Sequence, residues 1–300
     1  MSQLKSLAKT WTIRTLSCLA AIYLTILGIL ILNETRLVYP VSRYPNGNWN
    51  PVDFHYDEVK FQSADGTKLI GWHLRLPKAS ETEGGRSPNR TVLICHGNGE
   101  NVAQSAQGNG NYFREALQAE VFEFDYRGYG KSEGTPHEAG ILQDAEAALA
   151  CVCNLTNKTP DEIILVGYSI GGGPAVHLAA KCGCKVLVLQ RTFSSLSDAA
   201  QEQYPWLPVR YLMRNQYPST QKVKSYQGPV FQSHGDADRL IPIRLAKQLY
   251  QSAPSKQKSF VEVKGMTHLD PLPKGYWPKL EAFIRTIEQD GESRGTALIP

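Results

Sequence analysis

The chain has 300 residues, of which 20% are charged and 42% hydrophobic, values typical of a globular protein rather than a disordered one. Its formal net charge of +4 is small, and the basic residues are spread along the chain instead of clustering. This distribution argues against a nucleic-acid-binding protein. The length suits one large α/β domain preceded by an N-terminal segment.

Residues 1–15 form a polar, basic tail, and residues 16–32 form an apolar run without any charge. Such a run lies at the lower limit of what spans the hydrocarbon core of a bilayer, about 17–25 residues. A cleaved signal peptide is the competing interpretation, but residues 33–36 offer no small-x-small cleavage site. A buried core helix is disfavoured because the run is apolar on every face. We therefore predict a retained, single-pass transmembrane anchor.

The sequence encodes the orientation of this anchor only weakly. Three basic residues precede the apolar run, and Arg36 and Arg43 follow it. This small excess favours an N-terminus in the cytoplasm and leaves open on which side of the membrane the domain lies. Residues 33–54 are rich in turn-forming residues, and we interpret them as an irregular linker to that domain.

Residues 55–290 are predicted to form a single α/β domain. Two strands around the turn at 64–67 indicate an antiparallel hairpin at a sheet edge. Strands and helices then alternate, which is typical of a parallel sheet with helices on both faces. The pattern predicts about eight strands, at 58–62, 69–76, 91–95, 121–124, 163–166, 185–189, 229–232 and 259–263, and helices that include 101–118, 138–153, 243–252 and 273–288. Residues 291–300 are expected to be a loose tail.

The strand at 163–166 leads into Gly167-Tyr168-Ser169-Ile170-Gly171, which matches G-x-S-x-G. This pattern marks a nucleophile elbow, a sharp strand-to-helix turn that exposes a serine hydroxyl. The serine adopts a strained backbone conformation, and the two flanking glycines leave room for the chain to pass closely. A glycine-rich helix start with an incidental serine is the alternative. The strand before the motif and the helix after it favour Ser169 as a nucleophile.

The alternation of strands and helices breaks between residues 192 and 228, where the chain carries an aromatic and apolar insertion. This insertion is either a cap over the active site or a long surface excursion. Loops of this length in compact domains usually have a function, which favours the cap.

A serine hydroxyl is a weak nucleophile until a base takes its proton and a carboxylate orients that base. His268 follows the last predicted strand, from which a base reaches the elbow, so we predict His268 as the base. The other six histidines are expected to have structural roles. The loop after the preceding strand carries two candidate acids, Asp236 and Asp238, and their spacing alone does not choose between them.

An oxyanion hole needs two backbone N–H groups, one from the residue after the nucleophile and one from the loop after the third strand. Ile170 follows the serine, and residues 96–99 (His-Gly-Asn-Gly) occupy that loop. We predict the amides of Asn98 and Ile170 as the donors; a plain Gly/Asn turn is the alternative for the same letters. No His, Cys or carboxylate cluster has metal-ligand spacing, so we expect neither a metal nor another cofactor.

Five motifs together resemble the α/β-hydrolase family in their order along the chain: His96–Gly99, Phe124–Ser132, Gly167–Gly171, His234–Asp238 and Gly265–His268. More closely, residues 35–290 resemble the membrane-anchored BEM46-like branch, which is related to eukaryotic protein depalmitoylases. The resemblance implies the α/β-hydrolase fold and an acyl-transfer hydrolase without cofactor. It also implies Asp238 as the acid, because this aspartate lies four residues after the histidine of H-G-x-x-D. It does not fix the substrate, since members cleave esters, thioesters or peptides.

Two classes of function remain. The first is a membrane-anchored serine hydrolase that cleaves carboxylic esters or thioesters through an acyl-enzyme on Ser169, with a serine peptidase as a variant. The second is a catalytically idle hydrolase fold that acts as a binding module. The elbow glycines and all three predicted catalytic residues are present, which favours the enzyme. Aromatic and apolar side chains are typical of an acyl-chain pocket, so Trp206, Leu207 and Tyr211 are expected to contact a lipophilic substrate near the membrane.

Overall fold

The computed structural model describes residues 2–52, 54–76 and 89–296. Its centre is one eight-stranded sheet with the strand order β1-β2-β4-β3-β5-β6-β7-β8. The pairs β1–β2 and β2–β4 are antiparallel, and every other neighbouring pair is parallel. The strands are β1 (Asp57–Gln62), β2 (Lys68–Leu74), β3 (Arg90–Cys95), β4 (Ala119–Phe124), β5 (Ile163–Tyr168), β6 (Val186–Gln190), β7 (Val230–Gly235) and β8 (Lys258–Val263). The predicted mostly parallel, eight-stranded sheet is confirmed.

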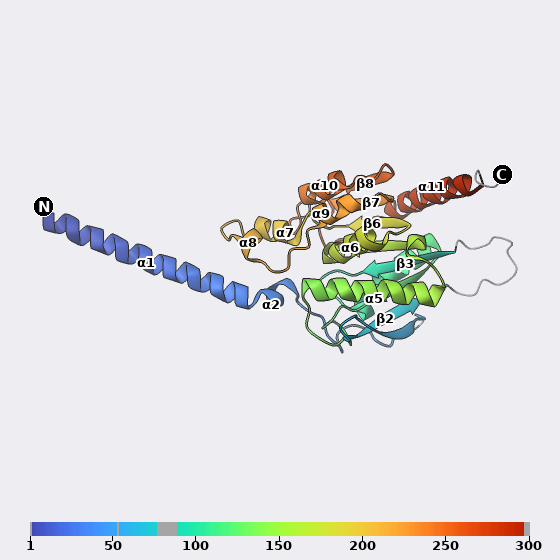
Figure 1. The fold of residues 1–300 in the computed structure, drawn as a ribbon, viewed down its shortest axis with the longest axis horizontal. Helices are drawn as coiled ribbons and strands as arrows, with labels where there is room; N and C mark the ends of the chain where they lie inside the picture. The colour runs from blue at the N-terminus through green and yellow to red at the C-terminus, as the bar shows by residue number, and fades with distance from the viewer. Residues whose placement is uncertain (1, 53, 77–88, 297–300) are drawn as a thin grey trace.

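Helices cover both faces of this sheet (Figure 1), and each face has its own buried cluster of apolar side chains. Strand β5 shows the division, because Ile163 and Leu165 belong to one cluster and Ile164 and Val166 to the other. This alternation is the two-residue period of a strand that is buried on both faces. The first cluster includes α5 (Glu138–Thr156), α6 (Gly172–Cys182) and α10 (Ile243–Ser252), and the second includes α4 (Asn111–Leu117) and α11 (Tyr276–Thr296).

Two of the predicted helices differ from the observed ones. The helix expected at 101–118 is divided into α3 (Val102–Ser105), the π-helical turn η1 (Ala106–Gly110) and α4. Glycines at 108 and 110 weaken the regular helix at this point. Helix α11 starts at Tyr276, after two prolines at 271 and 273 that lack the amide hydrogen needed inside a helix. It continues to Thr296, so the expected tail at 291–300 is helical that far, and residues 297–300 lie outside the described part.

The N-terminal segment is one long helix, α1 (Ser2–Leu32), which includes the residues expected as a basic tail and projects away from the domain (Figure 1). Its stretch Lys5–Leu32 is long and apolar enough to cross a membrane. The segment predicted as a linker instead packs on the domain. It contains the short helix α2 (Glu34–Val38), and Tyr39 and Trp49 are buried in the domain core.

The insertion between residues 192 and 228 forms three short helices and one 3₁₀ turn: α7 (Leu196–Gln203), α8 (Val209–Leu212), α9 (Ser219–Lys222) and η4 (Val223–Ser225). Figure 1 shows α7 and α8 at the end of the domain from which α1 projects. The chain between α7 and α9 contacts α1 and α2 through Trp206, Arg214 and Asn215. The insertion and the N-terminal helices therefore lie side by side, although about 180 residues separate them in the sequence.

Candidate active site

Ser169 stands at the end of β5, where the strand turns sharply into α6. Its φ of +53° lies in the left-handed region that non-glycine residues rarely adopt. A Cβ on Gly167 would lie 2.6 Å from the carbonyl oxygen of Gly171, and a Cβ on Gly171 would collide with the carbonyl oxygen of Cys95. Both flanking positions therefore require glycine, as the G-x-S-x-G motif predicts.

The three residues predicted to be catalytic meet at the carboxyl edge of the sheet. Nε2 of His268 lies 3.0 Å from Oγ of Ser169, and Nδ1 of His268 lies 2.7 Å from Oδ2 of Asp238. All three residues are buried. They follow β5, β7 and β8, whose parallel carboxyl ends share one edge of the sheet. This arrangement allows a proton to pass from the serine hydroxyl to an imidazole that a carboxylate orients.

The environment of Asp238 keeps its carboxylate ionised. Burial alone would raise the pKa of Asp238, but hydrogen bonds from His234 and His268 outweigh it and hold the pKa well below its usual range. The amides of Leu240 and Ile241 donate to Oδ1 at 2.9 and 2.8 Å. A negative charge next to Nδ1 favours the tautomer of the histidine that leaves Nε2 free to accept a proton.

The competing acid, Asp236, points elsewhere. It is exposed, and its Oδ1 accepts a hydrogen bond of 2.5 Å from the amide of Gly265. This contact ties the loop after β7 to the loop after β8. The structure thus brings Asp238, and not Asp236, to His268.

Three further residues position this centre: the predicted motifs include His234 and Tyr168 but do not predict this role for them, and Arg191 lies outside every motif. His234 is buried, with its Nε2 3.2 Å from Oδ2 of Asp238 and 2.7 Å from the carbonyl oxygen of Ile241. Nη1 of Arg191 and the hydroxyl of Tyr168 both donate to the carbonyl oxygen of His268, at 2.9 and 3.0 Å. They fix the backbone of the loop that carries the imidazole. Their shared sequence signal is a place at or near the carboxyl end of a buried strand.

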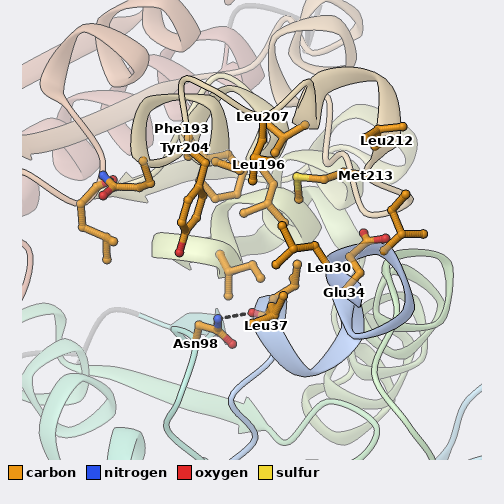
Figure 2. A pocket seen from close by; sticks show the side chains of 18 of the residues that line it. Leu30, Glu34, Leu37, Asn98, Phe193, Leu196, Tyr204, Leu207, Leu212 and Met213 are labelled. Carbon is orange, nitrogen blue, oxygen red and sulfur yellow. Dashed lines mark hydrogen bonds between the residues drawn. The ribbon is translucent and has the colours of Figure 1, made fainter. Parts of the chain in front are cut away.

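The predicted oxyanion residues, Asn98 and Ile170, both line the cavity in front of Ser169. The Asn98 side chain makes two hydrogen bonds, one of which is drawn in Figure 2. Its Nδ2 donates to the carbonyl oxygen of Val38 at 2.5 Å, and its Oδ1 accepts from the Tyr129 hydroxyl at 2.6 Å. These contacts fix the loop after β3 next to the elbow, where a backbone amide can face a developing oxyanion.

A largely apolar cavity of about 450 Å³ opens above Ser169. Trp206 and Leu207 line it, as predicted substrate contacts should. Tyr211 does not: its side chain is 89% exposed, and the prediction for this residue is not met. The reason is helical geometry. Val209 and Leu212 lie three residues apart on the cavity side of α8, so Tyr211 lies on the opposite side.

One wall of this cavity comes from residues that are not among the predicted substrate contacts. They belong to α1 and α2: Ile26, Leu27, Leu30, Ile31, Glu34, Leu37 and Val38. Figure 2 shows Leu30, Glu34 and Leu37 across the cavity from Leu207, Leu212 and Met213 of the insertion. In the part of the chain that the structure describes, no three His, Cys, Asp or Glu side chains lie close enough together to hold a metal ion.

Comparisons with known proteins point to the same fold. Residues 90–220 match the family described as the alpha/beta hydrolase fold. The chain is 33% identical to the uncharacterized protein Rv2307c of Mycobacterium tuberculosis over 86% of this chain and 89% of that protein. It is 30% identical to protein bem46 of Schizosaccharomyces pombe over 88% of this chain and 90% of that protein.

Solved structures share the fold at lower sequence identity. The esterase Pf2001 of Pyrococcus furiosus superimposes with a TM-score of 0.64 at 18% identity, covering 80% of this chain and 96% of that one. Together, the elbow geometry, the sheet order and these similarities establish the family. The chain is an α/β-hydrolase and belongs to the BEM46-like branch of that family.

Proposed function

We propose that this α/β-hydrolase is a membrane-anchored serine hydrolase that cleaves long-chain carboxylic esters or thioesters through an acyl-enzyme on Ser169. The observation that carries the proposal is the continuous contact from Ser169 through His268 to Asp238 at the base of an apolar cavity. A serine held this way has a base to accept its proton and a carboxylate to orient that base.

In the first half of the reaction, Oγ of Ser169 attacks the substrate carbonyl carbon while Nε2 of His268 takes the hydroxyl proton. The C–O or C–S bond to the leaving group then breaks, and His268 gives the proton to the departing alcohol or thiol. Asp238 remains a carboxylate and stabilises the imidazolium that forms in between. The amides of Asn98 and Ile170 stabilise the negative oxygen, each contributing about 3 kcal/mol in the transition state.

In the second half, a water molecule attacks the acyl-enzyme. His268 takes one proton from this water as its oxygen bonds to the carbonyl carbon. The bond between that carbon and Oγ of Ser169 then breaks, and His268 returns the proton to the serine. The products are a carboxylic acid and the free enzyme, so no oxidant, reductant or metal is required.

The cavity supports a substrate with a long acyl chain. Its volume of about 450 Å³ falls in the range of small-molecule sites, roughly 300–1,000 Å³. Among the described residues that line it, Glu34 is the only one with a charged side chain. Burying methylene groups there stabilises the complex by about 0.8 kcal/mol each.

The anchor part of the proposal rests on α1. No charged residue lies between Arg14 and Glu34, and a helix of that length measures about 30 Å, the thickness of a bilayer core. We expect the N-terminus on the cytoplasmic side, since the basic residues before the apolar run are in slight excess. Extraction of cell membranes at alkaline pH should leave the full-length chain in the membrane pellet. Release of a shortened chain would instead identify residues 16–32 as a cleaved signal peptide.

The chemistry is tested by labelling purified full-length protein in detergent with a fluorophosphonate, which reacts with activated serines. Ser169 should be modified and Ser169→Ala should not, while the control Ser225→Ala, at an exposed position outside the cavity, should label like the wild type. A panel of acyl esters, thioesters and peptides then identifies the bond that is cleaved. Equal labelling of Ser169→Ala contradicts the elbow assignment, and cleavage of peptides alone identifies a peptidase.

A further inference from the structure

The apolar helix that should anchor the chain also forms part of the cavity above Ser169. The α1 residues that line it are Ile26, Leu27, Leu30 and Ile31. Their spacing of one, three and one residues places them on one face of the helix, and Glu34 at the start of α2 continues this face. From Ile26 to Glu34 the helical rise is about 12 Å, so the cavity follows the helix for about two turns.

This face of α1 is fixed to the insertion at two levels. Near the outer end of the cavity, the hydroxyl of Tyr23 donates to the carbonyl oxygen of Trp206 at 3.2 Å, and the two rings lie 6.5 Å apart. Near the domain, Glu34 is 5% exposed and accepts hydrogen bonds from the amides of Arg214 and Asn215, each at 2.9 Å. The contact between helix and insertion is therefore a specific one.

A buried polar network extends the inner contact into the domain. Nδ2 of Asn215 also donates to Glu34, at 2.8 Å, and Oδ1 of Asn215 accepts from the Tyr39 hydroxyl and from the amide of Glu138, at 2.9 and 2.7 Å. The Tyr39 hydroxyl in turn contacts the hydroxyl of Tyr217. Buried polar groups that satisfy one another in this way hold a single arrangement of the anchor, the insertion and the domain.

The outer end of the cavity opens beside the charge-free stretch of α1. Ile26 and Trp206 line the cavity and are still 38% and 56% exposed, so the cavity reaches the molecular surface beside them. Ile26 lies about 12 Å from Glu34 inside the charge-free stretch of about 30 Å. If this stretch spans the bilayer, the surface beside Ile26 contacts acyl chains and not water.

The exposed side chains of the insertion fit a position at the surface of a membrane. Tyr204 and Tyr211 are exposed, and Arg210 and Arg214 lie near them in the sequence. Aromatic rings with a polar edge, together with basic residues, are enriched where a protein meets the headgroup region of a membrane. The insertion therefore presents an interfacial surface beside the anchor.

From these observations we infer that α1 is a wall of the substrate site, and that a lipid's acyl chain enters laterally, between Ile26 and Leu27 on one side and Trp206 and Leu212 on the other. The inference rests on the proposed serine-hydrolase function and adds the route and the position of the acyl chain. An acyl chain that left the membrane through water would expose its methylene groups to water, and each exposed methylene group costs free energy. A chain that moves directly from the bilayer into this cavity avoids that cost.

The test uses the full-length protein in phosphatidylcholine nanodiscs and a long-chain alkyl fluorophosphonate with a diazirine at the end of its chain. After reaction and irradiation, digestion and mass spectrometry locate both ends of the probe. We expect the phosphorus on Ser169 and photo-crosslinks in the tryptic peptide 15–36, which contains the α1 wall. Labelled Ser169 with crosslinks only outside peptide 15–36 overturns the inference and leaves the proposed function intact. Absence of label on Ser169 overturns the proposed function.

Adjacent positions on α1 supply a matched pair of variants. Leu30 lines the cavity, whereas Ile29 is exposed and does not. Leu30→Trp should fill the cavity and lower the ratio of kcat/KM for a long-chain ester to that for an acetate ester at least tenfold. Ile29→Trp adds the same side chain on the lipid-facing side and should leave this ratio within twofold of wild type. An unchanged ratio in Leu30→Trp, or an equal drop in Ile29→Trp, contradicts the role of α1 as a wall.

Discussion

The catalytic centre and the cavity above it are built in different ways. Ser169, Asp238 and His268 each follow a strand of one sheet within a few residues, so the parallel order of the strands brings them together. The cavity walls come from two segments, α1–α2 and the insertion, that meet through side chains about 180 residues apart. The chemistry therefore depends on local geometry at the sheet edge, whereas access and selectivity depend on long-range packing.

The strongest test of the centre is removal of its base. His268→Ala leaves Ser169 without the partner that lies 3.0 Å from its hydroxyl. We expect kcat to fall by about 10⁵–10⁶-fold, as for other triads that lose their histidine. Turnover of a long-chain and a short-chain ester should fall equally, because the cavity is unchanged. A loss confined to long-chain substrates would contradict the division between centre and cavity.

The choice of acid is tested by two asparagine variants in one loop. Asp238→Asn removes the charge that holds Nδ1 of His268 and should lower kcat by about 10⁴-fold, because the imidazole then adopts the wrong tautomer. Asp236→Asn changes only an exposed side chain that bonds the amide of Gly265, and its effect should stay within a few-fold. The two rates measured under saturating substrate decide the assignment, and the reverse order of effects would move the acid to Asp236.

This contrast explains how much the sequence could predict. The strands, the elbow with Ser169 and the position of His268 each follow from a short local pattern. The spacing leaves Asp236 and Asp238 open, and the resemblance to the family selects Asp238. Arg191 and Tyr168 complete the centre through the carbonyl oxygen of His268, and His234 contacts the carboxylate of Asp238. No local pattern predicts these contacts.

The walls of the cavity were predicted only in part, for a similar reason. The segment 33–54 has the composition of a linker, and nothing near Glu34 indicates that it bonds Asn215. The aromatic and apolar composition of the insertion predicts Tyr211 as a cavity residue. Helix α8 has only four residues, too few for the sequence to show which side chains face the cavity, and Tyr211 is exposed.

The junction between anchor and insertion is tested by Glu34→Ala. The substitution leaves the amides of Arg214 and Asn215 without their acceptor, so the free energy of unfolding in detergent should fall by about 2–3 kcal/mol. The control is Glu133→Ala, which removes an exposed ion pair with Lys68 and should cost under about 1 kcal/mol. Similar small effects for both variants would show that the anchor is only loosely attached.

The pH dependence of this junction has a definite sign. Burial alone would raise the pKa of Glu34, but hydrogen bonds from Asn215 and Arg214 outweigh it and lower the pKa below 4.5. A group whose pKa is lowered by folding stabilises the folded state when it is ionised, above pH 4.5, and loses this contribution as the pH falls through its folded pKa. The difference in stability between wild type and Glu34→Ala should therefore shrink as the pH falls from 6 towards 3. A constant difference would assign the effect to packing alone.

The smallest expected effect concerns the side of the cavity opposite the anchor. Trp206 and Leu207 both line the cavity, and Leu207 is buried there. Replacing both with alanine removes apolar contacts that only a long acyl chain reaches, so KM for a long-chain ester should rise about tenfold relative to KM for acetate. That change corresponds to about 1.4 kcal/mol, roughly the burial of two methylene groups.

Tyr211→Ala is the matched control for this last variant, because it removes an aromatic side chain from the same insertion at an exposed position that does not line the cavity. Its KM ratio should equal that of the wild type in detergent, where no bilayer is present to contact the ring. If Trp206 and Leu207 only stabilised the insertion, their removal would lower turnover of both esters equally and leave the ratio unchanged. A selective rise in KM for the long chain distinguishes a substrate contact from a packing contact, because packing does not depend on the length of the acyl chain.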